Sequence, residues 1–126
     1  MATRFTIARE MQDGTIQSIY GHWDGYPDGA GATLQHSYTD ERKIEKLIDL
    51  GDLSVLDDDL GEKHNFENRP EGHSSFYGRD RGETGIDALT HTSVTDWLRF
   101  RRGSCCEWGY LWDGVRWNTY EITENI

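Results

Sequence analysis

The stretch CEWGYLWDGVRWNTYEI, residues 106–122, carries the clearest local structure signal in this chain of 126 residues. Strand-like alternation places four side chains on one face: Cys106, Trp108, Tyr110 and Trp112. The Asp113-Gly114 pair that follows favours a tight turn, because such turns need backbone angles with positive φ. We therefore expect a β-hairpin here, in which Trp112 and Trp117 pair across the two strands.

The same pattern occurs near the start of the chain. RFTIARE (residues 4–10) and TIQSIYGHW (residues 15–23) both alternate, and Asp13-Gly14 lies between them. Because an Asp-Gly pair between alternating runs is a strong hairpin signal, we expect a second hairpin here.

The residues between the hairpins change to helical spacing. TDERKIEKLIDLG, residues 39–51, predicts a helix that Thr39 can cap and Gly51 can end. Its apolar side chains recur at intervals of three and four and form one stripe: Ile44, Leu47 and Ile48.

Shorter elements fill the rest of the middle. We expect helices in GATLQHSY (31–38) and in SVTDWLRF (93–100), the latter capped by Ser93. Residues 53–56 are expected to form a tighter turn, residues 73–79 a strand around Phe76, and residues 61–72 a polar loop.

Strand pairs at both ends with helices between them predict a single α+β domain over residues 1–126. We expect an antiparallel sheet of four to five strands, with two to three helices packed on one face. Five Trp, six Tyr and four Phe supply a core in which the hairpin rings meet the Ile44 stripe.

The charge restricts the possible partners. A formal net charge of −10 disfavours direct binding to nucleic acid or to anionic membranes, and it suits a partner with a basic face. Acidic residues dominate from Asp40 to Glu71, whereas arginines collect later in the chain.

The two cysteines are adjacent and poorly placed to bridge, which favours reduced thiols in the cytoplasm. MATRFTIARE lacks the apolar run of a secretory leader, and no segment is apolar enough to span a membrane.

Two loops are candidate ligand-binding sites. In HWDGYP, residues 22–27, Trp23 and Tyr26 offer flat rings to a base or sugar, and Asp24 can hold a hydroxyl group. The alternative, which the composition favours, is that this segment only turns a corner. In YGRDRGETG, residues 77–85, Arg79 and Arg81 can hold an anion, or they can simply pair with neighbouring acids.

No metal or cofactor is expected, because the five histidines and two cysteines do not follow the spacing of zinc ligands.

Four segments resemble a family of short, uncharacterised proteins of tailed phages and prophages. They are SIYGHWDGYPDGAGATL, KIEKLIDLGDLSVL, YGRDRGE and WGYLWDG, and the likeness is most specific at residues 22–27. The resemblance implies a non-structural accessory protein that works in the cytoplasm of an infected bacterium. It supplies no activity and no catalytic residues.

These observations favour a non-catalytic binding module for a host protein or a small anionic, nucleotide-like ligand, with Trp23, Asp24, Tyr26, Arg79 and Arg81 as binding residues. One alternative is an acidic protein that covers a DNA-binding surface of the host. Another, weaker one is a small hydrolase with His22 as base, oriented by Asp24.

Overall fold

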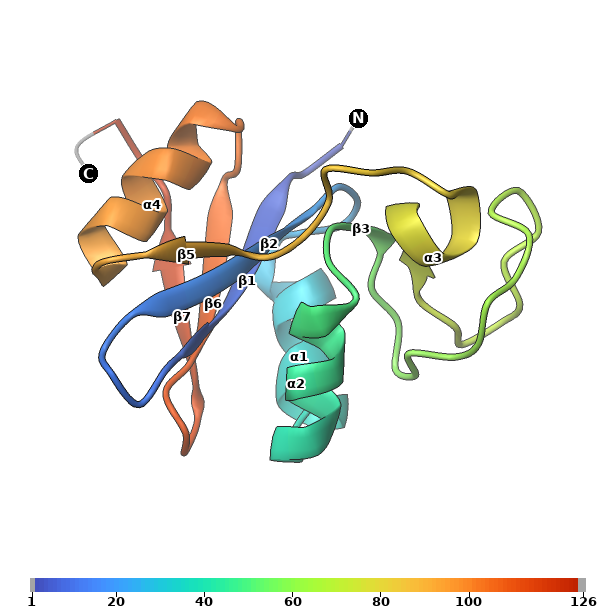
Figure 1. The fold of residues 1–126 in the computed structure, drawn as a ribbon, viewed down its shortest axis with the longest axis horizontal. Coiled ribbons are helices and arrows are strands. Elements are labelled where there is room, and N and C mark those ends of the chain that lie inside the picture. The colour runs from blue at the N-terminus through green and yellow to red at the C-terminus, as the bar shows by residue number, and fades with distance from the viewer. Residues whose placement is uncertain (1, 125–126) are drawn as a thin grey trace.

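Both predicted hairpins form in the computed structural model, which describes residues 2–124 (Figure 1). The first joins β1 (Phe5–Glu10) to β2 (Ile16–Gly21), and the second joins β6 (Trp108–Trp112) to β7 (Trp117–Glu121). Gly14 and Gly114 adopt positive φ at the two turns, at +86° and +97°. The indole rings of Trp112 and Trp117 pair across the second hairpin, with centroids 5.5 Å apart.

The sheet is larger than predicted and is mixed. Its strands run in the order β4-β3-β2-β1-β6-β7, and β5 (Leu89–His91) pairs with β2 beside this row. β1 runs parallel to β6, and β2 runs parallel to β3 (Leu53–Val55). The prediction of a purely antiparallel sheet of four to five strands is therefore wrong.

Length explains the missed strands. β3 and β5 contain three residues each, and β4 (Ser75–Phe76) contains two, so none shows a readable alternation. The expected turn at 53–56 is β3 instead. The expected strand at 73–79 is reduced to β4, after which the chain turns into α3 (Tyr77–Arg81). Residues 61–72 form the predicted loop without a helix or strand.

Helices cover both faces of the sheet. A π-helical turn, η1 (Pro27–Gly31), leads into α1 (Ala32–Ser37), and α2 (Glu41–Asp49) follows. These elements pack on one face, whereas α4 (Val94–Gly103) packs on the other (Figure 1). The prediction that all helices share one face is wrong, because both faces of the central strands are apolar.

Consecutive β1 residues show this division. Ile7 belongs to the larger core cluster, which includes the Ile44 stripe, and Trp108 packs against the same cluster as expected. Ala8 belongs to a second cluster, with Trp97 and Leu98 of α4. Since neighbouring strand residues point to opposite faces, the sheet has a core on each side.

The helix ends follow their local chemistry. The Ser93 hydroxyl accepts a hydrogen bond from the Asp96 amide and caps α4, as predicted. Asp40 occupies the N-cap position of α2 in place of the predicted Thr39. Gly51 follows that helix with φ +84°, which lets the chain turn directly into β3.

Candidate functional site

The predicted corner at residues 22–27 lies at the surface, directly after β2. Trp23 and Tyr26 are 41% and 43% exposed, and Asp24 adopts a left-handed backbone with φ +57°. The backbone around them is fixed, because the Trp23 and Gly25 amides donate to Ser54 and Thr3 carbonyl oxygens. The segment therefore turns a corner and also presents two exposed rings.

The two arginines predicted to accompany these rings belong to another part of the fold. All three guanidinium nitrogens of Arg79 donate hydrogen bonds within the chain, to Asp80 and to the carbonyl oxygens of Gly61 and Ser74. Arg79 thus braces the loop that precedes β4.

Arg81 is more exposed than Arg79 but is also engaged. Its guanidinium lies over the Phe66 and Tyr77 rings, 4.5 and 4.8 Å from their centroids, and forms an ion pair with Glu83. Its observed contacts hold the 61–72 loop against α3.

His22 and Asp24 do not form the arrangement considered for a hydrolase. Both residues lie beyond the end of β2, so they do not share a strand face. The Nδ1 atom of His22 is hydrogen-bonded to the Tyr20 hydroxyl at 2.8 Å.

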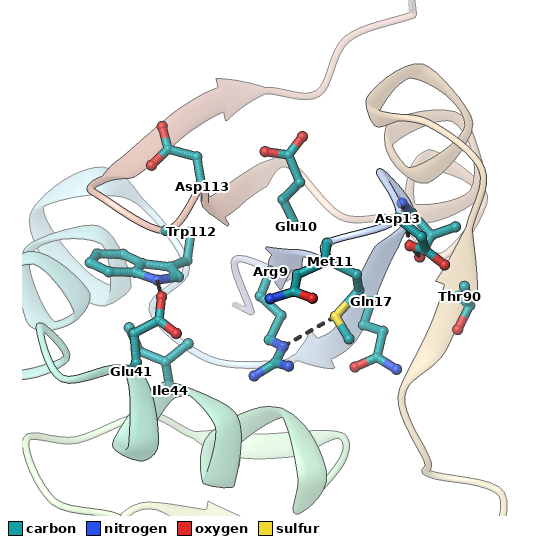
Figure 2. Close-up of a pocket in the computed structure, with 13 residues that line it drawn as sticks. Arg9, Glu10, Met11, Asp13, Gln17, Glu41, Ile44, Thr90, Trp112 and Asp113 are labelled. Carbon is teal, nitrogen blue, oxygen red and sulfur yellow. Dashed lines mark hydrogen bonds between the residues drawn. The ribbon is translucent and has the colours of Figure 1, made fainter.

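A concave site that the sequence did not indicate lies at the opposite end of the sheet. Because β1 and β6 are parallel, the turns that follow them lie at the same end. Between the turns and α2 is a cavity of about 830 Å³, here called the hairpin pocket (Figure 2). β5 contributes Thr90 to its wall.

The lining of the hairpin pocket is acidic with an apolar part. Four carboxylates line it, against the single guanidinium of Arg9: Glu10, Asp13, Glu41 and Asp113. Ile44, Met11 and Trp112 add apolar surface. This arrangement suits a cationic group with an apolar stem better than it suits an anion.

The two turn aspartates stay ionised at neutral pH. The Asp113 carboxylate accepts hydrogen bonds from the Asn118 amide and the Val115 and Arg116 backbone, which lower its pKa to about 2. The hydroxyl and amide of Thr15 lower the pKa of Asp13 in the same way. Each turn therefore fixes a permanent negative charge at the pocket.

Two further charged side chains of the pocket, Glu41 and Arg9, are held in place. Glu41 accepts a hydrogen bond from the Trp112 indole at 3.0 Å, which ties α2 to the second hairpin. Arg9 donates to the Met11 sulfur (Figure 2). It also lies 3.6 Å from Glu45. Arg9, the one cationic side chain among the described residues that line the pocket, is therefore already engaged.

The sequence predicts both Asp-Gly turns, but it does not predict that they line the same pocket. The missing information is the parallel pairing of β1 and β6, which joins strands from opposite ends of the chain. No local pattern carries that pairing.

Among residues 2–124, no group of three or more His, Cys, Asp or Glu side chains is arranged to hold a metal ion. The helices in this range include none that is long and apolar enough to cross a bilayer. Comparison of the chain with protein-family models, curated proteins and solved structures gave no match.

Proposed function

We propose that this protein is a non-catalytic binding module whose hairpin pocket accepts a lysine or arginine side chain from a basic protein partner. The observation that carries this proposal is the charge balance of the pocket, four carboxylates against one engaged guanidinium. The partner class includes proteins whose DNA-binding surface is basic. The phage setting is part of the proposal and is supported by the sequence resemblance.

Electrostatics on two scales support a basic partner. The formal net charge of −10 attracts a cationic surface over a distance set by the salt concentration. Within the pocket, the ionised turn aspartates provide the local complement, and the apolar wall near Ile44 accommodates the methylene stem of the bound side chain.

The test is an NMR titration of the ¹⁵N-labelled protein with a short arginine-rich peptide. We expect shifts at the Gly114 amide, the Gln17 side chain and the Trp112 indole, all of which line or border the pocket. Affinity should fall as salt rises, because screening weakens attraction between exposed charges.

Paired variants separate the pocket from the overall charge. Glu10→Gln combined with Asp113→Asn should weaken binding about tenfold, since each exposed ion pair contributes up to about 1 kcal/mol. Asp28→Asn combined with Glu71→Gln removes the same charge from exposed positions outside the pocket and should have a much smaller effect. Equal effects of the two pairs, or shifts confined to other surfaces, would contradict the proposal.

A further inference from the structure

A second cluster lies at the other end of the β1–β2 ladder. In this ladder Glu10 pairs with Ile16 near the hairpin pocket, and Phe5 pairs with Gly21 at the far end. Four residues at or just beyond this far end form what we call the sheet-end platform: Arg4, Tyr20, His22 and Trp23.

Hydrogen bonding fixes the His22 ring. Its Nδ1 atom is 2.8 Å from the Tyr20 hydroxyl, and its ring packs at 88° to the Trp23 indole with centroids 4.8 Å apart. No hydrogen bond from the described part of the chain reaches Nε2.

Arg4 lies close enough to the Tyr20 phenol to act on its pKa, which burial, the larger effect, raises while the positive charge of Arg4 lowers it. The β1–β2 register, in which Phe5 pairs with Gly21, places Arg4 at the same end of the ladder as His22. The neutral His22 ring can donate from Nε2 to an anion in the tautomer whose Nδ1 accepts from the Tyr20 hydroxyl.

The platform carries the positive charge of Arg4. Arg4 forms none of the ion pairs found among the described residues. Burial, and then the positive charge of Arg4, lower the pKa of His22 below its usual value, so the ring is neutral at neutral pH. The free protein therefore offers one cation and, in the Nε2-protonated tautomer of His22, one neutral N–H donor, which together suit an anion.

The indole of Trp23 adds a flat, exposed surface beside these donors. This side chain is 41% exposed, although its backbone amide is pinned to the Ser54 carbonyl oxygen at 3.0 Å. An exposed ring on a fixed backbone loses little freedom when another ring stacks on it.

We propose that the sheet-end platform binds a nucleotide, with its phosphate on Arg4 and His22 and its base stacked on Trp23. This site is separate from the hairpin pocket, so its test does not depend on whether the pocket binds a basic partner. Of the binding residues that the sequence suggests, this proposal retains Trp23. Arg4 takes the anion-binding role predicted for Arg79, whose guanidinium is already engaged.

The experiment is an NMR and tryptophan-fluorescence titration with adenosine 5′-monophosphate, with adenosine and inorganic phosphate as matched probes. We expect saturable shifts of the Trp23 indole and the His22 ring, and binding of the nucleotide at least about tenfold tighter than that of either probe. No saturable shift at millimolar nucleotide, or equal affinity for phosphate and nucleotide, would overturn the proposal.

Single-residue variants identify the residues responsible. Trp23→Ala and Arg4→Met should each weaken nucleotide binding about tenfold, whereas Trp23→Phe and Arg4→Lys should retain most of it. Phe100→Ala removes an equally exposed ring, 49% accessible on α4, and should leave binding unchanged. Unchanged binding in Trp23→Ala, or equal loss in Phe100→Ala, would contradict the assignment; the ¹⁵N spectrum of each variant reports whether it folds.

Discussion

The indole N–H of Trp97 donates a hydrogen bond to the Thr6 hydroxyl at 3.0 Å, and both side chains are completely buried. The Thr6 hydroxyl in turn donates to the Ile19 carbonyl oxygen at 2.8 Å. Two hydrogen bonds thus connect α4, β1 and β2 within the smaller core. They add to the buried hydrogen bonds that Arg101 of α4 donates to the hydroxyl and carbonyl oxygens of Ser18 in β2.

Replacing Thr6 with Val should destabilise the protein by about 1–3 kcal/mol, because the shape is kept while the buried indole N–H loses its acceptor. Urea unfolding monitored by Trp fluorescence measures this loss. Thr6→Ser keeps the oxygen and should cost less than Thr6→Val. If both variants cost the same, the hydroxyl does not contribute as argued.

Gly21 is required by the ring of Phe5. A Cβ at Gly21 would lie 2.2 Å from a ring atom of Phe5, which is itself completely buried. Gly21→Ala should therefore cost about 1–3 kcal/mol through overpacking. Gly103→Ala is the matched control, because a Cβ there meets nothing within 4 Å, and it should be neutral or slightly stabilising. A tolerated Gly21→Ala would show that the Phe5 ring moves freely.

His91 should make stability depend on pH. It is buried, and its Nε2 lies 2.7 Å from the Ser18 hydroxyl, which also accepts a hydrogen bond from Arg101. Burial first, and then the charge of Arg101, lower the pKa of His91, although Asp96 opposes this shift. The folded state therefore binds a proton less readily than the unfolded state, so stability should fall as the pH drops below about 6.5.

Unfolding free energies measured at several pH values between about 5 and 7 test this expectation. His91→Gln should flatten the slope, and His22, whose pKa is also lowered, contributes to the slope that remains. His36→Gln, at an exposed position on α1, should leave the slope as it is. If the pH dependence of the unfolding free energy is unchanged in His91→Gln, His91 does not cause it.

The two cysteines should differ in reactivity. Burial raises the pKa of Cys106 to about 12, which leaves almost no thiolate at neutral pH, whereas Cys105 is exposed. Iodoacetamide at about pH 8 should therefore modify Cys105 alone in the native protein and both thiols after denaturation. Both thiols lie in the tryptic peptide 103–116, so tandem mass spectrometry of this peptide is needed to locate the label. Rapid native labelling of Cys106 would contradict its burial.

The elements that were predictable are those whose determinants are adjacent in sequence. The turn glycines, the Trp112–Trp117 pair and the Ser93 cap each depend on residues a few positions apart, and all three are present. Strand partners and helix faces depend on distant residues. That is why the sequence does not predict the parallel pairs or the position of α4, whereas β3 is simply too short to show an alternation.

The same distinction between local and distant determinants applies to the candidate binding residues. Trp23 and Tyr26 were recognised as surface rings from their turn residues. Arg4 was not singled out, because only the β1–β2 register places it beside Tyr20. The hairpin pocket likewise requires the pairing of β1 with β6.

The same pairing has a consequence for biosynthesis. While the nascent chain is being made, β1 can pair with β2 early, but its other edge stays open until Trp108–Trp112 leaves the ribosome. Phe5 and Ile7 therefore stay incompletely buried during most of translation, because Tyr110 and Trp112, which complete their core, are made late. Folding that depends on such distant contacts is slow, and a chain interrupted before β6 exposes an unpaired, apolar strand to aggregation or to chaperones.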